Sequence, residues 1–134
     1  MKIVKLNFCL NLFFVLAIVF SSCSRQNDED PLPQAGIQIT TPVENALVRF
    51  GETLLIKGTA TGNAELHGYE IAIRKLGGTN LYFQHYHGHD HTINIDESWK
   101  NTLNETADME IVVSAILDHE QHKQNKIVRF KIQN

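Results

Sequence analysis

Residues 111–117 read Ile-Val-Val-Ser-Ala-Ile-Leu, the most apolar segment of the chain outside its first 23 residues. Apolar side chains occupy every second position on one face, and Val112 and Ile116 add apolar groups to the other. A period of two with β-branched residues predicts a β-strand, because successive side chains of a strand point to opposite faces.

Segments on either side of this strand show the same alternation and are separated by turn-forming residues. Turns are expected at 61–63, 77–80, 87–90 and 121–125, and residues 99–107 have room for one helical turn. We predict an all-β domain over residues 37–134, an immunoglobulin-like antiparallel β-sandwich of about seven strands, with a small barrel as the alternative. The other strands are expected at 37–39, 53–60, 69–74, 81–85, 93–95 and 128–132.

Composition narrows the classes of function. The chain has 134 residues, 43% of them hydrophobic, with 12 basic and 15 acidic residues, which indicates one globular domain. A net charge of −3 provides no general basic face, so we expect no nucleic-acid partner. The sequence contains no glycine-rich phosphate loop and no serine nucleophile elbow, and we expect that the protein is not an enzyme.

The N-terminus has the features of a bacterial lipoprotein signal. Lys2 and Lys5 precede an apolar run over residues 6–20, which is short for a membrane span, and two serines then lead to Cys23. The pattern resembles a lipobox, so we predict a signal peptide over residues 1–22 and a lipid on Cys23. An ordinary secretory signal with an incidental cysteine is the alternative.

Residues 23–36 are polar and proline-bearing, and we interpret them as the lipidated cysteine and a flexible tether. The acidic run at 28–30 resembles the export signal of surface lipoproteins, although any solvated linker has a similar composition. We therefore expect an outer-membrane lipoprotein, with cell-surface exposure favoured by this run. Residues 24–134 contain no cysteine, so the domain is expected to fold without a disulfide.

The most distinctive motif is a histidine-rich segment over residues 85–91. Alternate side chains of an extended chain share one face, so imidazoles two residues apart can converge on one ion. In an up-and-down strand order, the loops 61–67, 87–91 and 118–125 fall at the same end of the domain, which adds ligands from the last loop. We predict a site for Zn²⁺, Cu²⁺ or Ni²⁺, since nitrogen and oxygen donors are present without sulfur. The candidate ligands are His85, His87, His89, Asp90, His91, Asp118, His119 and His122.

Two other interpretations of the histidines stay open. A solvated His-rich loop binds transition metals weakly without a physiological role, and a histidine-rich surface also responds to pH without any metal. A zinc protease is not indicated, because His119 and His122 are three residues apart and that helical motif requires a spacing of four.

The lipobox, the sandwich-like body, the segment 66–73 and the following His-Gly-His-Asp-His resemble a family of uncharacterised Bacteroidetes lipoproteins. These carry an Ig-like domain of unknown function with a His-Gly-His-x-His-like insert after the third strand. The resemblance covers about residues 37–134 and implies an extracytoplasmic Ig-like fold without a known activity. Arg74 and Lys75 stand where that family tends to have a further histidine, so no ligand is expected there.

The resulting hypothesis is a lipid-anchored, non-enzymatic binding module whose histidine end takes a transition metal. The alternative is an adhesion or assembly module that binds a surface protein or a glycan, with incidental histidines. An enzyme, for which a metal with an open coordination position would be the only route, is the least favoured.

Overall fold

A computed structural model describes residues 32–134, which form one compact unit built from strands. The predicted signal peptide, Cys23 and most of the predicted tether lie outside the described residues. No helix occurs within residues 32–134, so this part of the chain has no helix with the length and apolar character needed to cross a bilayer. The strands are β1 (Ala35–Thr41), β2 (Ala46–Arg49), β3 (Thr53–Lys75), β4 (Asn80–Lys100), β5 (Ala107–Ile116) and β6 (Lys123–Gln133).

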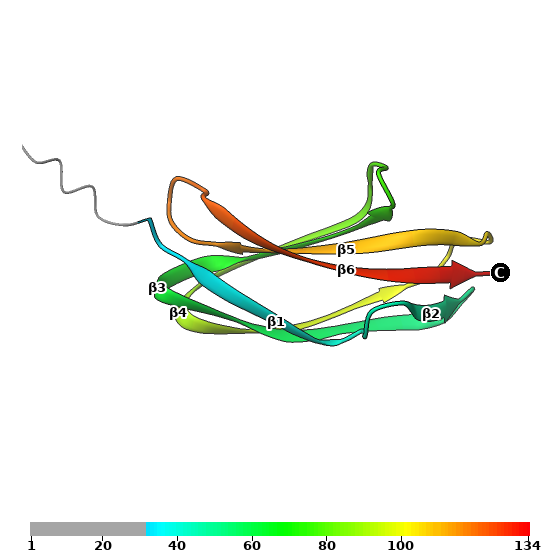
Figure 1. Ribbon diagram of the computed structural model, residues 1–134, viewed down its shortest axis with the longest axis horizontal. Helices are drawn as coiled ribbons and strands as arrows, with labels where there is room; N and C mark the ends of the chain where they lie inside the picture. Colours follow the sequence, from blue (N-terminus) through cyan, green and yellow to red (C-terminus); the bar gives the residue numbers. More distant parts are fainter. Residues whose placement is uncertain (1–31) are drawn as a thin grey trace, which may run out of the picture. The chain divides into compact units, whose positions relative to one another are not determined.

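The two long strands β3 and β4 bend sharply and belong to both layers of the sandwich (Figure 1). In the first layer, β1 pairs with residues 57–62 of β3, and residues 53–61 of β3 pair with residues 92–100 of β4. In the second layer, residues 68–75 of β3 pair with β5, and β5 pairs with β6. The all-β sandwich is thus confirmed, with the β-hairpin of β3 and β4 folded over as its corner.

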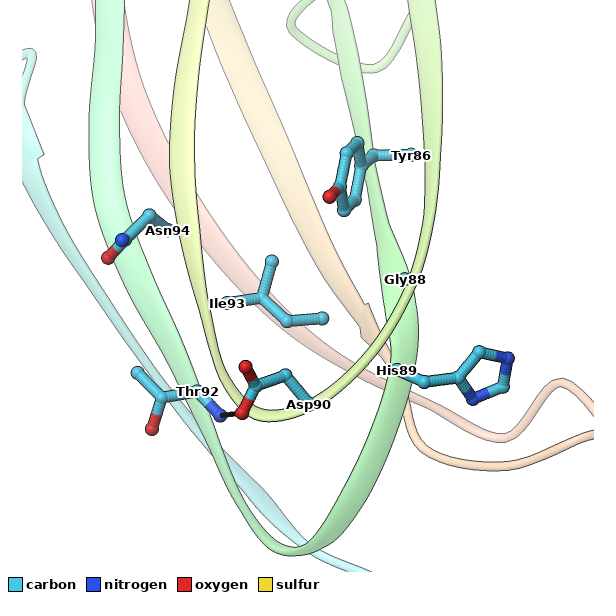
Figure 2. Close-up of a pocket in the computed structure, with 7 residues that line it drawn as sticks. All are labelled: Tyr86, Gly88, His89, Asp90, Thr92, Ile93 and Asn94. Atoms are coloured by element: carbon cyan, nitrogen blue, oxygen red, sulfur yellow. Dashed lines mark hydrogen bonds between the residues drawn. The ribbon is translucent and has the colours of Figure 1, made fainter.

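The bend follows from unequal strand lengths and from β-bulges. Between the pairs Thr61–Thr92 and Leu66–Asp90, β3 contributes residues 62–65, whereas β4 contributes one residue. Figure 2 shows β4 turning inside the wider turn of β3, and the longer path belongs to the outer strand. Gly62 permits this turn, because a Cβ atom there would overlap the carbonyl oxygen of Ala64.

The core lies between the two layers. Alternate side chains of both arms of β3 face inward, and the predicted strand 111–117 is buried almost throughout. Trp99 and Phe130 meet in the core at a ring-centroid distance of 6.1 Å and an interplanar angle of 73°, an edge-to-face contact. Both aromatic side chains are buried.

Several sequence predictions were wrong in detail. Residues 61–63 and 87–90, predicted as turns, lie inside β3 and β4, and bulges reverse the chain there without ending the strand pairing. Residues 101–106 form an irregular crossing instead of a helical turn. The short strand β2 was not predicted, and it pairs in parallel with β6, whereas the other pairings are antiparallel.

Candidate metal centre

Four imidazoles gather on the outside of the bend, and we call them the ring cluster: His67, His87, His89 and His119. A β-bulge assembles three of them, because β3 contributes His67 alone where β4 contributes Gly88 and His89. Bulges often re-aim side chains beside functional sites, and this one directs the ring of His67 to within 4.7 Å of the ring of His89, between centroids.

His87 and His89 have the spacing of two ligands on one ion. Their Nε2 atoms lie 3.2 Å apart. In tetrahedral geometry, two nitrogens at 2.0–2.1 Å from the same Zn²⁺ are roughly 3.3 Å apart. The pair therefore needs little rearrangement to share an ion.

Glu65 fixes the orientation of His89. Its Oε1 lies 3.0 Å from Nδ1 of His89, and a carboxylate only accepts, so Nδ1 carries the proton and donates it. Nε2 of the neutral ring is then the atom with a free lone pair, directed at His87. A carboxylate behind a ligating histidine is the usual outer-sphere arrangement of metal sites.

His119 reaches the ring cluster from the β5–β6 loop. Its ring centroid is 4.1 Å from that of His67 and 6.2 Å from that of His89. The loop is held by Asp118, whose Oδ1 accepts the backbone N–H of His122 at 3.0 Å and whose Oδ2 lies 2.6 Å from Nδ1 of His122. Three separate segments of the chain thus supply the four rings.

The electrostatics of the two neighbouring groups differ. Burial lowers the pKa of His67, and the nearby imidazoles of His119 and His89 lower it further, so the neutral ring is favoured. The hydrogen bond to Asp118 and its charge raise the pKa of His122, so the protonated ring is favoured relative to a free imidazole. Only a neutral imidazole ligates a metal.

The remaining predicted ligands lie apart from the ring cluster. His85 lies 3.4 Å, through Nδ1, from Glu70, whose carboxylate also accepts from Lys123 at 2.8 Å. Asp90 points into the concave side of the β4 bend and accepts the N–H of Thr92, whereas His89 points away from it (Figure 2). His91 is exposed within the bend.

Asp118 and His122 form a second group with Glu120, and we call these three residues the loop group. One donor atom from each lies within 4.8 Å of the others. The hydrogen bonds of Asp118 to His122 use both carboxylate oxygens, however, and must be broken or rearranged before this carboxylate binds an ion.

The concave side of the β4 bend forms a shallow cleft of about 310 Å³. Tyr86 and Asp90 point into it, with Ile93 opposite them (Figure 2). The ring of Tyr86 also stacks on that of Tyr69, with 5.1 Å between the ring centroids. His89 also lines the cleft, although its imidazole points away from the concave side (Figure 2).

Two residues of this arrangement were not among the predicted ligands. His67 was placed at the correct end of the domain by the strand order, but the motif at 85–91 directed attention to β4. No pattern in the sequence predicts the role of Glu65, because its contact with His89 depends on the unequal lengths of the β3 and β4 bends.

The donor set of the ring cluster fits a borderline transition metal. Four imidazoles and an outer carboxylate, without a thiolate, suit Zn²⁺, Cu²⁺ or Ni²⁺ better than a hard cation such as Mg²⁺. Four protein ligands also complete a tetrahedral shell, whereas catalytic zinc sites keep one position for water.

No protein-family model matches the chain, and no curated protein matches it. Among solved structures, the fold is similar to the fibronectin(III)-like modules of Clostridium thermocellum CbhA. That match has a TM-score of 0.46 and 14% sequence identity, and it covers 73% of this chain and 96% of the other.

Proposed function

We propose that this protein is a lipid-anchored, extracytoplasmic binding module without catalytic activity, whose ring cluster captures a divalent transition metal. The observation that carries the proposal is the pair of Nε2 atoms of His87 and His89, 3.2 Å apart, with Glu65 behind His89. The rings of His67 and His119 lie beside this pair, at centroid distances of 4.7 and 6.2 Å from the ring of His89, and would have to turn to bring a nitrogen to the same ion.

A non-catalytic role follows from the ligand count. Four imidazoles leave no open coordination position in a tetrahedral site, so a bound metal would have no place for a reacting water. Capture, sensing or transfer of the ion are the functions that such a closed, exposed site supports.

The test is elemental analysis and calorimetric titration with Zn²⁺, Cu²⁺ and Ni²⁺ on the full chain, made without a histidine tag. We expect one ion per chain, and alanine at position 87 or 89 should weaken binding about a hundredfold or more, because each variant removes a ligand. His67→Ala and His119→Ala should weaken it about tenfold or more.

His91→Ala is the matched control, since His91 is an exposed histidine of the same strand. It should bind as the parent does. Equal losses at His91 and at the ring cluster would show a solvated histidine string with incidental affinity. Unchanged binding in the 67 and 119 variants would refute the composite site.

The anchor is part of the same proposal and rests on the resemblance of residues 1–23 to a lipoprotein signal and of the body to the Bacteroidetes lipoprotein family. Cys23→Ala should release the protein from the membrane fraction or leave it uncleaved, because the stable anchoring given by two or more acyl chains is lost. Unchanged fractionation with the membrane would contradict it.

A further inference from the structure

Most strand edges of the sandwich are protected against pairing with another chain. β1 is short and has a bulge between Ile39 and Thr41, and β2 has only four residues. The arm of β4 in the first layer, residues 92–100, carries Asp96, Glu97 and Lys100. Bulges, short length and charges are the devices by which natural sheets prevent edge-to-edge association.

The other arm of β4, residues 80–89, carries no charged residue, and bulges at Leu81 and at Gly88 and His89 are the only protective feature that it shares with the edges above. It pairs with β3 along one side, and no strand of residues 32–134 pairs with its other side. The ten residues Asn-Leu-Tyr-Phe-Gln-His-Tyr-His-Gly-His contain no Lys, Arg, Asp, Glu or Pro. Leu81 and Phe83 are 47% and 52% exposed, so the arm presents large apolar groups beside an unpaired backbone.

An apolar row continues from this edge across the outer face of the second layer. The strand register places Phe83 beside Ala72, Ala72 beside Val112, and Val112 beside Ile127, so these side chains share one face. Phe83 at the edge is the exposed end of this row, and Ile127 on β6 is 48% exposed at the other end.

We propose that residues 80–89 of β4 form a homodimer interface, in which two copies of this chain pair edge to edge and antiparallel about a two-fold axis at Gln84. A two-fold axis sets each residue near it opposite itself or a near neighbour, so charges on the strand would face like charges. This arm contains no Lys, Arg, Asp or Glu, so pairing about the axis sets no such charge opposite a like charge.

The axis at Gln84 gives favourable cross-strand pairs. Tyr82 lies opposite Tyr86 of the second copy on one face, and Phe83 lies opposite His85 on the other. Aromatic pairs across antiparallel strands are among the stabilising ones. The two ring clusters then lie at opposite ends of the shared ribbon, and neither is needed to join the copies.

The test compares two edge strands with the same substitution. Gln84 on β4 and Gln38 on β1 are both exposed, so Gln84→Lys and Gln38→Lys add the same charge to different edges. Sedimentation equilibrium would be run on the full, tag-free chain in a neutrally buoyant detergent with EDTA, which removes any bridging metal. We expect a dimer for the parent and for Gln38→Lys, and a dimer Kd raised about tenfold or more for Gln84→Lys, since two lysines then face each other.

A second matched pair tests the apolar contact without adding charge. Phe83→Thr should also weaken the dimer, and Ile127→Thr, on the same face but away from the edge, should not. If the unsubstituted protein is a monomer, the proposal is wrong, even if residues 80–89 bind an added peptide. Dimers that form only with added Zn²⁺, or equal weakening by Gln38→Lys, would overturn it as well.

Discussion

The ring cluster and the loop group adjoin each other, yet the pKa of a histidine is lowered in the first and raised in the second. Burial and neighbouring imidazoles lower the pKa of His67, which favours the neutral form that a metal needs. In the loop group, hydrogen bonds from His122 hold the pKa of Asp118 low against the effect of burial, and Asp118 raises the pKa of His122. The surroundings thus favour the neutral imidazole in the first group and the protonated imidazole in the second.

The difference shows that close donors alone do not make a metal site. The loop group has three possible ligand atoms within 4.8 Å of one another, but both carboxylate oxygens of Asp118 already accept hydrogen bonds from His122. Its structural effect is to close the loop that presents His119 to His67. We therefore interpret Asp118 and His122 as residues that position a ligand of the neighbouring ring cluster.

The largest effect is expected from breaking the bulge that builds the ring cluster. Gly68 has φ of +127°, and a Cβ atom there would overlap the carbonyl oxygen of Tyr86. Gly68→Ala should lower the free energy of unfolding by about 3 kcal/mol, because both backbone strain and displacement of β4 are required. Chemical denaturation measures this loss.

Gly36→Ala is the control for that substitution. Gly36 lies in β1, has no atom within 4 Å of a Cβ position, and should change stability by less than about 1 kcal/mol. A mild effect of Gly68→Ala, comparable to that of Gly36→Ala, would mean that the bend tolerates another register and does not fix the rings.

The next effect separates the two groups by their carboxylates. Glu65→Gln should weaken Zn²⁺ binding about tenfold or more, because His89 loses the acceptor that orients its ring and raises its basicity. Glu120→Gln in the loop group should leave the affinity almost unchanged. Calorimetric titration of both variants decides between the groups, and the reverse order of effects would assign the ion to the loop group.

Much of the fold follows from apolar alternation in the sequence. The segments around 53–60, 69–74, 93–95, 111–117 and 128–132 are strands, and turns occur near Gly77 and Gln121, where both residues have positive φ. The bends were misread because the alternation changes phase there. In β3, the buried residues Ala60 and Leu66 are in phase, and the next one, Tyr69, follows three residues later. In β4, Tyr86 and the buried Ile93 both face the concave side of the bend although they are seven residues apart. A loop and a bulge both produce such a change, and glycine-containing segments suit either.

The same phase change explains what could be anticipated of the candidate site. Same-face placement of His87 and His89 and their convergence with His119 follow from strand period and strand order, and the structure brings these rings together. The roles of Glu65 and Asp118 depend on how far each bend extends, which is set by packing over the whole domain. Metal binding itself stays a prediction.

A smaller effect, the difference between the pKa values of His67 and His122, measures the contrast between the ring cluster and the loop group directly. In the metal-free protein, two-dimensional NMR of the imidazoles should show His67 titrating below 6.5 and His122 above it. The raised pKa of His122 contributes stability that is complete below 6.5 and is lost as the pH rises through its folded value. The lowered pKa of His67 contributes stability above 6.5 that is lost as the pH falls through its folded value.

Asp118→Asn sharpens that measurement, because it removes the charge but keeps an oxygen for the backbone N–H of His122. The pKa of His122 should return toward 6.5, and that of His67 should stay low, since burial is its main cause. Parallel shifts of both histidines would show that the ring cluster and the loop group are one electrostatic unit.

The smallest effect concerns His85, one of the two β4 histidines that lie outside the ring cluster. Burial alone would raise the pKa of Glu70, but hydrogen bonds from Lys123 and His85 outweigh it and leave the pKa below its usual 4.5. Glu70→Gln should cost about 0.5–1 kcal/mol at pH 7, the worth of a partly exposed ion pair. Because a depressed carboxyl pKa stabilises only the ionised fold, the difference from the parent should persist above 4.5 and fade as the pH falls through the folded value. Affinity for Zn²⁺ should not change, and a marked loss in this variant would move the boundary of the metal site to include His85.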